Sequence, residues 1–330
     1  MKKIRVAING FGRIGRAFYK LAKERKEIEI VAINDLGNRE NMEYLLKYDS
    51  VYGQSGVTLD GVEFISEKDP TLLPWKKYDI DVVVESTGLF VDYTKAKVHL
   101  DAGAKRVVIT APAKGGIEGK DGVTILMGLN EDRFATCPIT SNASCTTNAG
   151  SPLMAILDEA IGIEKAVLNT VHAYTASQSI VDGPAKKDLR EGRAAAQNIV
   201  PSSTGAAIAV TKALPQLVDK FDGISIRVPV IVGSIVDITF IAKRNTTRDE
   251  VNQILKKAAT TERWKNIFAV TEEPLVSSDI KSNPHASIAD LEMTRVVGGN
   301  LVKVLGWYDN EMGYTHTLVD HVIKAAANIK

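Results

Sequence analysis

The sequence predicts an α/β protein with two domains, a Rossmann-type parallel sheet domain and an α+β catalytic domain with a mixed or antiparallel sheet. Short apolar strands alternate with amphipathic helices from Ile4 to about Thr110, a G-x-G-x-x-G pattern follows the first strand, and β-rich runs lie close together in the second half. A chain of 330 residues, 45% of them hydrophobic, exceeds what one core usually organises. We expect the domains at residues 1–147 and 148–312, with a C-terminal helix at 313–330 that packs back on the first domain.

The first half supplies the parallel sheet. The expected strands are residues 4–9, 29–34, 82–85 and 107–109. The expected helices are residues 13–25 and 95–102, and the insert at 51–65 is expected to form hairpin strands.

The second half has longer β-rich runs with helices between them. The expected strands are residues 165–173, 224–232 and 234–241, and the expected helices are 152–161, 247–260 and about 313–329. This pattern suits a mixed or antiparallel sheet.

Composition excludes several classes of partner. Lysine and arginine number 41 against 40 aspartate and glutamate residues, so no overall field attracts nucleic acid or an anionic membrane. Two cysteines in a chain of this length form no disulfide framework, which favours a reducing compartment. No signal peptide or membrane-spanning run is visible, so we expect a soluble, cytoplasmic protein with no nucleic acid as its primary partner.

The first strand leads into a turn that is typical of dinucleotide-binding proteins. Gly10, Gly12 and Gly15 follow residues 4–9, and a helical pattern begins at Arg13. The first two glycines allow a tight turn and a close approach of the backbone to a pyrophosphate, and the third lets helix and strand pack. The helix N-terminus supplies free N–H groups and a positive dipole end, and Arg13 adds a cationic donor.

Asp35 favours NAD over NADP. It lies about twenty residues beyond Gly15, at the end of the second strand, where a carboxylate accepts hydrogen bonds from the adenosine ribose hydroxyls. The same charge repels the phosphate that NADP carries there. Asn34 and Asp35 are also common turn-capping residues, and both roles are compatible. Thr110 follows another strand, at the edge where open parallel sheets collect ligands.

Cys145 is the candidate nucleophile. It lies in the polar segment 144–148 (SCTTN), just before the apolar helical run at 152–161, and Pro152 suits the first turn of that helix. A cysteine there feels the positive end of the helix dipole, which lowers the pKa of its thiol, while nearby hydroxyl and N–H groups can bind anions. The alternative is a small buried cysteine beside a capping cluster. Cys137 lacks such polar surroundings.

His172 is the candidate base. It ends the apolar run at 165–171, and of the five histidines it alone precedes a hydroxyl-rich stretch, residues 174–178 (YTASQ). The alternative is a histidine that serves only as a polar surface or core group. A dinucleotide site together with a cysteine at the domain junction indicates aldehyde oxidation. A thiolate adds to the aldehyde, the hemithioacetal loses hydride to NAD as His172 accepts a proton, and a thioester remains.

Six segments resemble the phosphorylating glyceraldehyde-3-phosphate dehydrogenase family, and the likeness runs from Ile8 to the C-terminal helix. They are residues 8–15 (INGFGRIG), 141–148 (SNASCTTN), 172–178 (HAYTASQ), 201–207 (PSSTGAA), 227–230 (RVPV) and 307–314 (WYDNEMGY). The resemblance implies oxidation and phosphorylation of glyceraldehyde 3-phosphate to 1,3-bisphosphoglycerate, a glycolytic and gluconeogenic step, by a homotetramer. It places the loop at 178–197 near a subunit contact and the cofactor.

The resemblance also implies a role for each site residue. Cys145 carries the acyl group, His172 activates its thiol, and Thr175 and Arg227 bind the phosphate of the substrate. The residues implied to line a second anion site, where inorganic phosphate attacks the thioester, are Ser144, Thr146, Thr204 and Gly205. The residues implied to contact NAD are Gly10, Gly12, Arg13, Ile14, Asp35, Lys68, Thr110 and Asn310, of which Asn310 orients the nicotinamide carboxamide. No metal is implied.

Three positions depart from the pattern of many relatives. Ile208 replaces a lysine, which we expect to weaken the electropositive field near the anion sites. Met312 replaces a large aromatic residue, which we expect to alter the packing of the last helix. Lys68 replaces an arginine near the adenine.

Two alternative functions remain. An erythrose-4-phosphate dehydrogenase shares the fold and nucleophile, but its relatives differ after the histidine, where the HAYT run resembles the glyceraldehyde-3-phosphate enzymes. A non-catalytic NAD-binding regulator or RNA-binding protein is the alternative from another class. The near-neutral charge disfavours RNA, and the intact Cys145 and His172 disfavour a protein that has lost catalysis.

Overall fold

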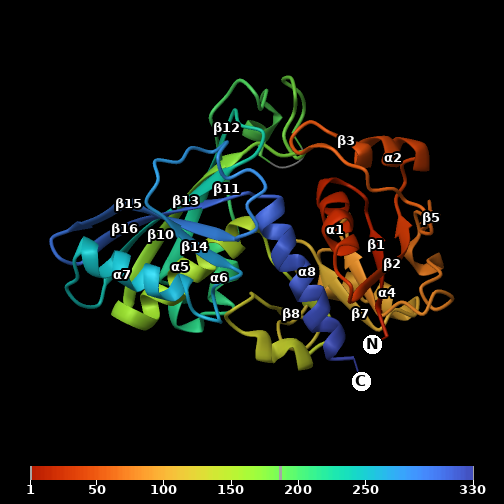
Figure 1. Cartoon of the computed structure of the whole chain (residues 1–330), viewed down its shortest axis with the longest axis horizontal. Coiled ribbons are helices and arrows are strands. Elements are labelled where there is room, and N and C mark those ends of the chain that lie inside the picture. The colour runs from red at the N-terminus through yellow and green to blue at the C-terminus, as the bar shows by residue number, and fades with distance from the viewer. Residues whose placement is uncertain (1, 186–187, 330) are drawn as a thin grey trace. The chain divides into compact units, whose positions relative to one another are not determined.

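The computed structural model describes residues 2–185 and 188–329. It divides into two compact units, one formed by Met1–Ser144 with Thr315–Lys330 and the other by Cys145–Tyr314 (Figure 1). Residues 186–187 of the loop expected at 178–197, and Lys330 at the end of the expected C-terminal helix, lie outside the described residues.

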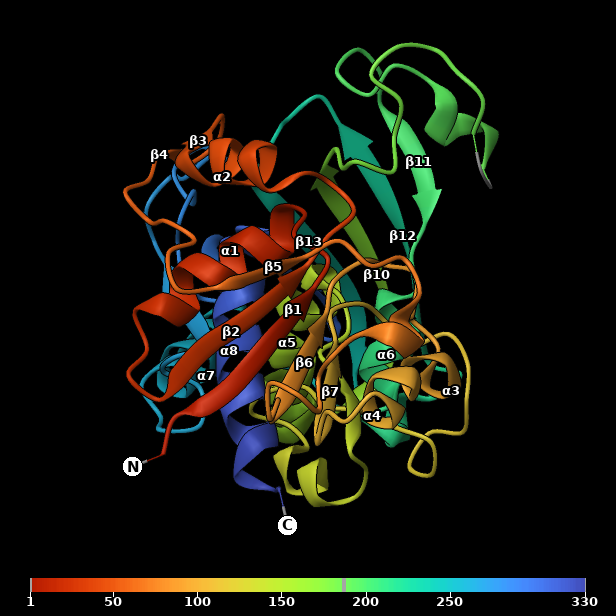
Figure 2. The same cartoon turned by 90° about the vertical axis from the view of Figure 1, so that its right-hand side faces the viewer.

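The first unit contains a parallel sheet with the strand order β5-β2-β1-β6-β7-β9-β8. Its strands are β1 (Ile4–Asn9), β2 (Ile28–Asn34), β5 (Glu63–Ile65), β6 (Val82–Glu85), β7 (Arg106–Ile109), β8 (Val123–Thr124) and β9 (Ile139–Ser141). The recorded pairings are parallel, and Figure 2 shows β2, β1, β6 and β7 side by side. Both β6 and β7 are buried along their whole length, and apart from Glu85 and Arg106 they consist of apolar residues, as central parallel strands do. The Rossmann-type sheet is confirmed.

The helices of this unit connect and cover the strands. They are α1 (Arg13–Lys23), α2 (Arg39–Lys47), α3 (Tyr93–Ala96) and α4 (Val98–Asp101), with 3-10 turns at Pro70–Leu72 and Glu131–Ala135. From Thr315 onward, α8 (Met312–Ala327) belongs to the same unit. Its buried His321 lies 2.7 Å from the Thr140 hydroxyl and 3.1 Å from Asn142 Oδ1, so the helix is tied to the end of β9.

Two local expectations for this unit were wrong, and one of its helices was not expected. Residues 95–102 do not form one helix, because the chain breaks at Lys97 into α3 and α4. The insert at 51–65 forms only a short hairpin of β3 (Tyr48–Asp49) and β4 (Gly53–Gln54), and β5 instead joins the main sheet beside β2. Alternating residues predict an extended strand without specifying its partner. Helix α2 was missed because Leu46 is its buried residue and it therefore shows no apolar stripe.

The second unit contains a mixed sheet with the order β11-β12-β10-β13-β16-β15-β14. Its strands are β10 (Ile163–Ala173), β11 (Val200–Ser203), β12 (Phe221–Val228), β13 (Ser234–Ala242), β14 (Phe268–Thr271), β15 (Ser287–Val297) and β16 (Leu301–Tyr308). β10 pairs parallel with β12 and antiparallel with β13, which confirms the mixed sheet. β12 ends four residues before the expected limit at 232, and Pro229, which has no N–H to donate, follows its last residue.

Helices cover one face of this sheet. Figure 1 shows α5 (Cys145–Ile161), α6 (Ala206–Thr211) and α7 (Arg248–Ala259) together on that face, and 3-10 turns lie at Leu189–Gly192 and Pro215–Leu217. The expected start of α5 at Pro152 was wrong, because the helix begins at Cys145 and contains Pro152 in its interior. Burial of nearly the whole helix stabilises it despite the hydrogen bond that proline removes. In the part of the chain that the structure describes, no helix is long and apolar enough to cross a membrane.

Candidate active site

The glycine-rich turn lies between β1 and α1. Gly10 has a φ of +96°, and a side chain there would lie 2.6 Å from the backbone nitrogen of Thr87. A side chain at Gly15 would lie 2.2 Å from the carbonyl oxygen of Gly10, so this glycine permits the helix to approach the strand. A side chain at Gly12 would meet nothing within 4 Å. Gly10 and Gly15 are therefore required by packing, whereas Gly12 leaves open space at the start of α1.

Asp35 is fixed to this turn. One carboxylate oxygen accepts a hydrogen bond of 2.7 Å from the Phe11 N–H, and the other accepts one of 2.8 Å from the Gly37 N–H. Each oxygen keeps a further lone pair, so the carboxylate can still accept bonds from ribose hydroxyls. These features fit a dinucleotide. The helix N-terminus offers open space for the pyrophosphate, and the oriented carboxylate beside it can accept hydrogen bonds from the ribose.

The other expected cofactor residues of this unit have diverse surroundings. Arg13 pairs with Asp49 through 2.9 Å, so its guanidinium is shared with a carboxylate. Thr110 donates from its N–H and from its hydroxyl to the carbonyl oxygen of Glu85, each over 3.0 Å. Ile14 is half-buried and Lys68 is exposed.

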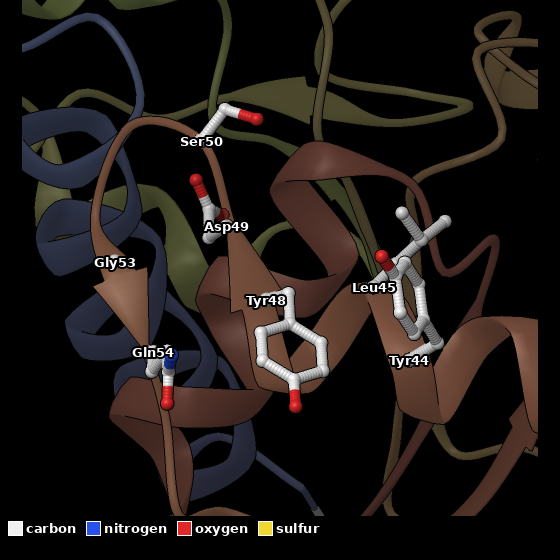
Figure 3. Close-up of a pocket in the computed structure, with 7 residues that line it drawn as sticks. All are labelled: Tyr44, Leu45, Tyr48, Asp49, Ser50, Gly53 and Gln54. Atoms are coloured by element: carbon white, nitrogen blue, oxygen red, sulfur yellow. The ribbon is translucent and has the colours of Figure 1, made fainter.

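The first unit contains a pocket of about 280 Å³, whose lining residues are shown in Figure 3. It is lined by residues of α2 and of the β3–β4 hairpin, namely Tyr44, Leu45, Tyr48, Asp49, Ser50, Gly53 and Gln54. No expected site residue lines it, and its recorded link with the turn is the pair between Asp49 and Arg13.

A buried polar network under the turn was not predicted from sequence. Glu85, at the end of β6, accepts a 2.6 Å hydrogen bond from the Asn9 amide and lies 3.0 Å from His99 Nε2. Trp75 donates its indole N–H to His99 Nδ1 over 3.1 Å, so the ring proton of a neutral His99 lies on Nε2 and faces the carboxylate. The N–H and hydroxyl of Thr87 also donate to Glu85. A glutamate that ends an apolar strand (VVVE) was the available signal.

In the second unit, Cys145 is the first residue of α5, so its sulfur lies at the positive end of a 17-residue helix. Ala143, two residues earlier, is fully buried and has a φ of 55°, a left-handed conformation that residues with side chains rarely adopt. Such strain concentrates at functional turns. Cys145 is half-buried, whereas Cys137 is buried, and both thiols are free.

Cys145 and His172 meet. The sulfur lies 3.4 Å from His172 Nε2, and the imidazole is held at the end of β10, where it makes a T-shaped contact with the ring of Tyr308. The structure thus brings together the expected nucleophile and base, 27 residues apart in the sequence.

The protonation of this pair differs from the expectation for the thiol. Burial raises the pKa of the Cys145 thiol, although Arg227 and hydrogen bonds with Thr146 oppose the rise. Burial, and then the charge of Arg227, lower the pKa of His172 to about 3. The expected lowering of the thiol pKa was therefore wrong, because desolvation outweighs the charge and the hydrogen bonds that lower it. Both shifts favour a neutral thiol beside a neutral imidazole, which is the state a general base requires.

Arg227 lies beside His172 because the two residues are register partners in the parallel pair β10–β12. Its Nη1 is 2.8 Å from His172 Nδ1 and donates to the Ala173 carbonyl oxygen over 3.3 Å. The side chain is half-buried, so its remaining N–H groups can bind an anion.

A chain of hydroxyl groups supports the segment that follows Cys145. Thr170 donates to the Ile235 carbonyl over 3.1 Å, so the Tyr308 hydroxyl, 2.8 Å away, donates to Thr170. The Thr146 hydroxyl, 2.9 Å from Tyr308, is then left to donate to it. Tyr308 lay within a segment that carried the family resemblance, yet its role was not predicted because the contact depends on the position of β16 in the sheet.

The remaining expected substrate residues make local hydrogen bonds. Thr175 lies 3.0 Å from the Ser177 hydroxyl, and its N–H donates to Gln178 Oε1 over 3.3 Å. The Thr204 hydroxyl accepts from the Ala206 N–H over 3.2 Å, and Gly205 caps the start of α6. None of these recorded bonds joins Thr175 or Thr204 directly to Cys145.

Asn310, Ser144 and the departures Ile208 and Met312 are the remaining positions of interest. Asn310 is buried, and its Oδ1 accepts bonds from the Gly233 N–H at 3.1 Å and the Ser234 hydroxyl at 3.2 Å, which leaves its amide nitrogen end as the one able to face a nicotinamide. Ser144 is half-buried and is the last residue of its segment in the first unit. Of the two departures, Ile208 is exposed on α6, and Met312 is half-buried at the first position of α8.

Comparison with known proteins gives a consistent result. Residues 4–93 match the family model for the NAD binding domain of glyceraldehyde 3-phosphate dehydrogenase, and residues 144–310 match the model for its C-terminal domain. The chain is 47% identical to a glyceraldehyde-3-phosphate dehydrogenase of Streptomyces coelicolor, over 96% of this chain and 97% of that protein. It is 48% identical to one from Borreliella burgdorferi (96% and 98%) and 44% identical to glyceraldehyde-3-phosphate dehydrogenase 2 of Bacillus subtilis (99% and 98%).

Proposed function

The chain belongs to the glyceraldehyde-3-phosphate dehydrogenase family, and we propose that Cys145 and His172 carry out an NAD-dependent, phosphorylating oxidation of glyceraldehyde 3-phosphate. The observation that carries the proposal is the 3.4 Å approach of the Cys145 sulfur to His172 Nε2, within the segments that carry the family motif. The product is 1,3-bisphosphoglycerate, which places the reaction in glycolysis and gluconeogenesis.

His172 takes up and releases the protons of this reaction. His172 Nε2 takes the thiol proton, and the sulfur electron pair forms a bond to the aldehyde carbon. The imidazolium returns its proton to the carbonyl oxygen, giving a hemithioacetal on Cys145, and takes it back as that carbon loses hydride. NAD supplies the hydride acceptor when bound. Attack of inorganic phosphate on the thioester then releases the Cys145 thiolate.

Two anion sites are part of the proposal. Thr175 and Arg227 bind the phosphate of the aldehyde, because Arg227 presents further N–H donors next to the base and Thr175 presents a hydroxyl. Ser144, Thr146, Thr204 and Gly205 bind the attacking phosphate, through hydroxyl and N–H groups beside the start of α5 or α6.

The cofactor site is proposed in the first unit. The residues that would hold NAD are Gly10, Gly12, Arg13, Ile14, Asp35, Lys68 and Thr110, with Asn310 on the nicotinamide carboxamide. The open space at Gly12 and the oriented carboxylate of Asp35 support this assignment. On this basis residues 1–147 form the NAD-binding domain, residues 148–312 the catalytic domain, and the helix at 313–330 packs with the former.

A homotetramer is the proposed assembly, in the cytoplasm. Helices cover one face of the second sheet, while Val167 on β10 and Ile224 on β12, exposed by 61% and 54%, lie along a groove of about 400 Å³ made by sheet residues. Exposed apolar side chains gathered on a sheet fit a second copy of the chain. Sedimentation equilibrium of a Val167→Lys variant tests this surface, because a charge at an interface should yield smaller species, and an unchanged mass would rule the surface out.

The test of the activity is NADH formation from glyceraldehyde 3-phosphate and NAD with and without inorganic phosphate. Without phosphate, the proposal expects at most one NADH per active site, and phosphate then restores continuous turnover. Cys145→Ser should abolish both phases, whereas Cys137→Ser, at the buried free thiol, should retain them. Continuous turnover without phosphate would reject the acyl-phosphate mechanism. Faster turnover of erythrose 4-phosphate in the same assay would instead identify the longer sugar as the substrate.

A further inference from the structure

The hydroxyl group of Ser234 lies between the strand that carries His172 and the side chain of Asn310. Ser234 is the first residue of β13 and the register partner of Tyr308 in the antiparallel pair β13–β16, and Asn310 follows Tyr308 by two residues. The Ser234 oxygen lies 3.1 Å from the backbone nitrogen of Ala173, at the end of β10, and 3.2 Å from Asn310 Oδ1. Ser234 and Asn310 are 1% and 7% exposed, so these contacts are shielded from water.

The direction of these two hydrogen bonds is fixed by chemistry. A backbone N–H only donates, so the Ser234 oxygen accepts from Ala173 and donates its own proton to Asn310. The atom of Asn310 that receives this proton is the carbonyl oxygen, because the Gly233 N–H also donates to the same end of the amide, over 3.1 Å. An amide nitrogen in that position would face two donors. The side chain therefore has one orientation that satisfies both neighbours.

These two donors use the full accepting capacity of Asn310. A carbonyl oxygen has two lone pairs, and here one receives the Gly233 N–H and the other the Ser234 O–H. What Asn310 can still offer a ligand is the pair of N–H groups on its amide nitrogen. A nicotinamide carboxamide has an oxygen that accepts and an amino group that donates, and its oxygen is the atom that can bind such a side chain.

We propose that Ser234 is a positioning residue for the cofactor, which keeps the amide nitrogen of Asn310 directed at the carboxamide oxygen of nicotinamide and leaves no acceptor for the carboxamide amino group. This inference rests on the proposed role of Asn310 as the residue that binds the carboxamide. Because the carboxamide is bonded directly to the ring, holding its oxygen restricts the rotation of the ring and orients the carbon that receives the hydride.

Binding of NAD and of ADP-ribose distinguishes this role from a purely structural one. ADP-ribose lacks the nicotinamide ring, so a general disturbance of the site weakens both ligands, whereas a weaker carboxamide bond affects NAD alone. In isothermal titration calorimetry, Ser234→Ala should raise the Kd for NAD by about 3- to 10-fold and leave the Kd for ADP-ribose unchanged. Ser234→Thr, which retains a hydroxyl group, should bind NAD as the wild type does.

Ser225→Ala is the matched control. Ser225, on β12, is fully buried like Ser234, and its hydroxyl has no hydrogen-bond partner within the described part of the chain. The same substitution should therefore leave the affinities for both ligands at their wild-type values. Equal weakening of NAD and ADP-ribose in Ser234→Ala, or no change in either, would overturn the proposal.

Two further titrations test whether Ser234 acts through Asn310. Asn310→Ala should raise the Kd for NAD at least as much as Ser234→Ala does, and the double variant should lose no more affinity than Asn310→Ala alone. The analogue 3-acetylpyridine adenine dinucleotide keeps the carbonyl oxygen and lacks the amino group, so it should bind the wild type within about twofold of NAD. Additive losses in the double variant, or a larger loss for the analogue, would also overturn the proposal.

The titrations separate a failure of this inference from a failure of the proposed function, because they require no turnover of glyceraldehyde 3-phosphate. If Asn310→Ala weakens NAD and Ser234→Ala does not, the role of Ser234 is refuted and the proposed cofactor site stands. If Asn310→Ala leaves NAD binding unchanged, the proposed cofactor role of Asn310 is refuted, and this inference with it.

Discussion

Replacement of Tyr308 by phenylalanine tests the hydroxyl chain behind the nucleophile. The ring is fully buried and retains its packing in the variant, so the change removes one oxygen without creating a large cavity. Thr170 keeps its bond to the Ile235 carbonyl, but the Thr146 hydroxyl loses the Tyr308 oxygen, 2.9 Å away, as an acceptor and keeps only its hydrogen bond with the Cys145 sulfur.

The expected magnitude follows from the loss of that one oxygen acceptor. Loss of a buried hydrogen bond costs about 0.5–1.5 kcal/mol, and Thr146 is 4% exposed, so water does not replace the lost acceptor. Each kcal/mol shifts the melting temperature of a domain this size by about 2–4 °C. Scanning calorimetry should therefore show Tyr308→Phe melting about 1–6 °C below the wild type. The burst of NADH should also slow, because Thr146 adjoins Cys145 and loses its anchor.

Two companion variants make the test specific. Tyr44 is 60% exposed, so Tyr44→Phe should change the free energy of unfolding by no more than about 0.5 kcal/mol. In Thr146→Val the same hydroxyl is absent, so adding Tyr308→Phe to it should cost much less than Tyr308→Phe alone, with a coupling of about 0.5–3 kcal/mol. Full additivity, or an unchanged melting temperature for Tyr308→Phe, would refute the assigned direction of the chain.

Four further predictions concern the first unit. Gly10→Ala should destabilise the protein by about 1–3 kcal/mol in thermal unfolding, because φ is +96° and the new carbon would lie 2.6 Å from a backbone nitrogen. Gly12→Ala should keep its stability and raise the Kd for NAD about tenfold in a fluorescence titration, and unaltered binding would contradict a pyrophosphate there. Glu85→Gln should cost about 3 kcal/mol, because an amide group would face buried donors, and an unchanged melting temperature would argue against the network. The free energy of unfolding should fall as pH drops from 6.5 toward 3. In the unfolded state His321 binds a proton near pH 6.5, whereas burial lowers the pKa of His321 in the folded state to about 3. His321→Asn should reduce that slope by about 1.4 kcal/mol per pH unit in urea titrations, and an unchanged slope would exclude a buried neutral His321.

Periodicity predicted the elements that bury a regular stripe or run. Strands β1 and β6 and helix α7 had nearly the expected bounds, because Thr247 caps α7 and each strand contains a short apolar run, residues 6–8 in β1 and 82–84 in β6. Helix α2 buries too few side chains to show a helical period. The start of α5 was predicted too late, at Pro152, because proline is usual in the first turn of a helix, whereas this buried helix is stabilised by its surroundings and tolerates proline in its interior. Strand order depends on contacts that no local pattern encodes.

The site was predictable at the level of residue types and only partly at the level of contacts. Polar segments around Cys145 and after His172 indicated a nucleophile and a base, and the structure joins them. The contact of Arg227 with His172 depends on the register between β10 and β12, and the partners of Glu85 depend on which strands and helices surround β6. Such pairings are set by tertiary packing. The direction of the thiol pKa also could not be predicted, because it depends on how much protein surrounds the sulfur.

The central claim, that Cys145 carries the oxidised substrate as a thioester, is tested most directly by trapping that intermediate. Wild-type protein mixed with NAD and glyceraldehyde 3-phosphate in phosphate-free buffer should gain one phosphoglyceryl group per chain by intact-protein mass spectrometry, mapped to the peptide that contains Cys145. Addition of inorganic phosphate should remove it. NADH formation without any adduct at Cys145, or an adduct that phosphate leaves in place, would contradict the account.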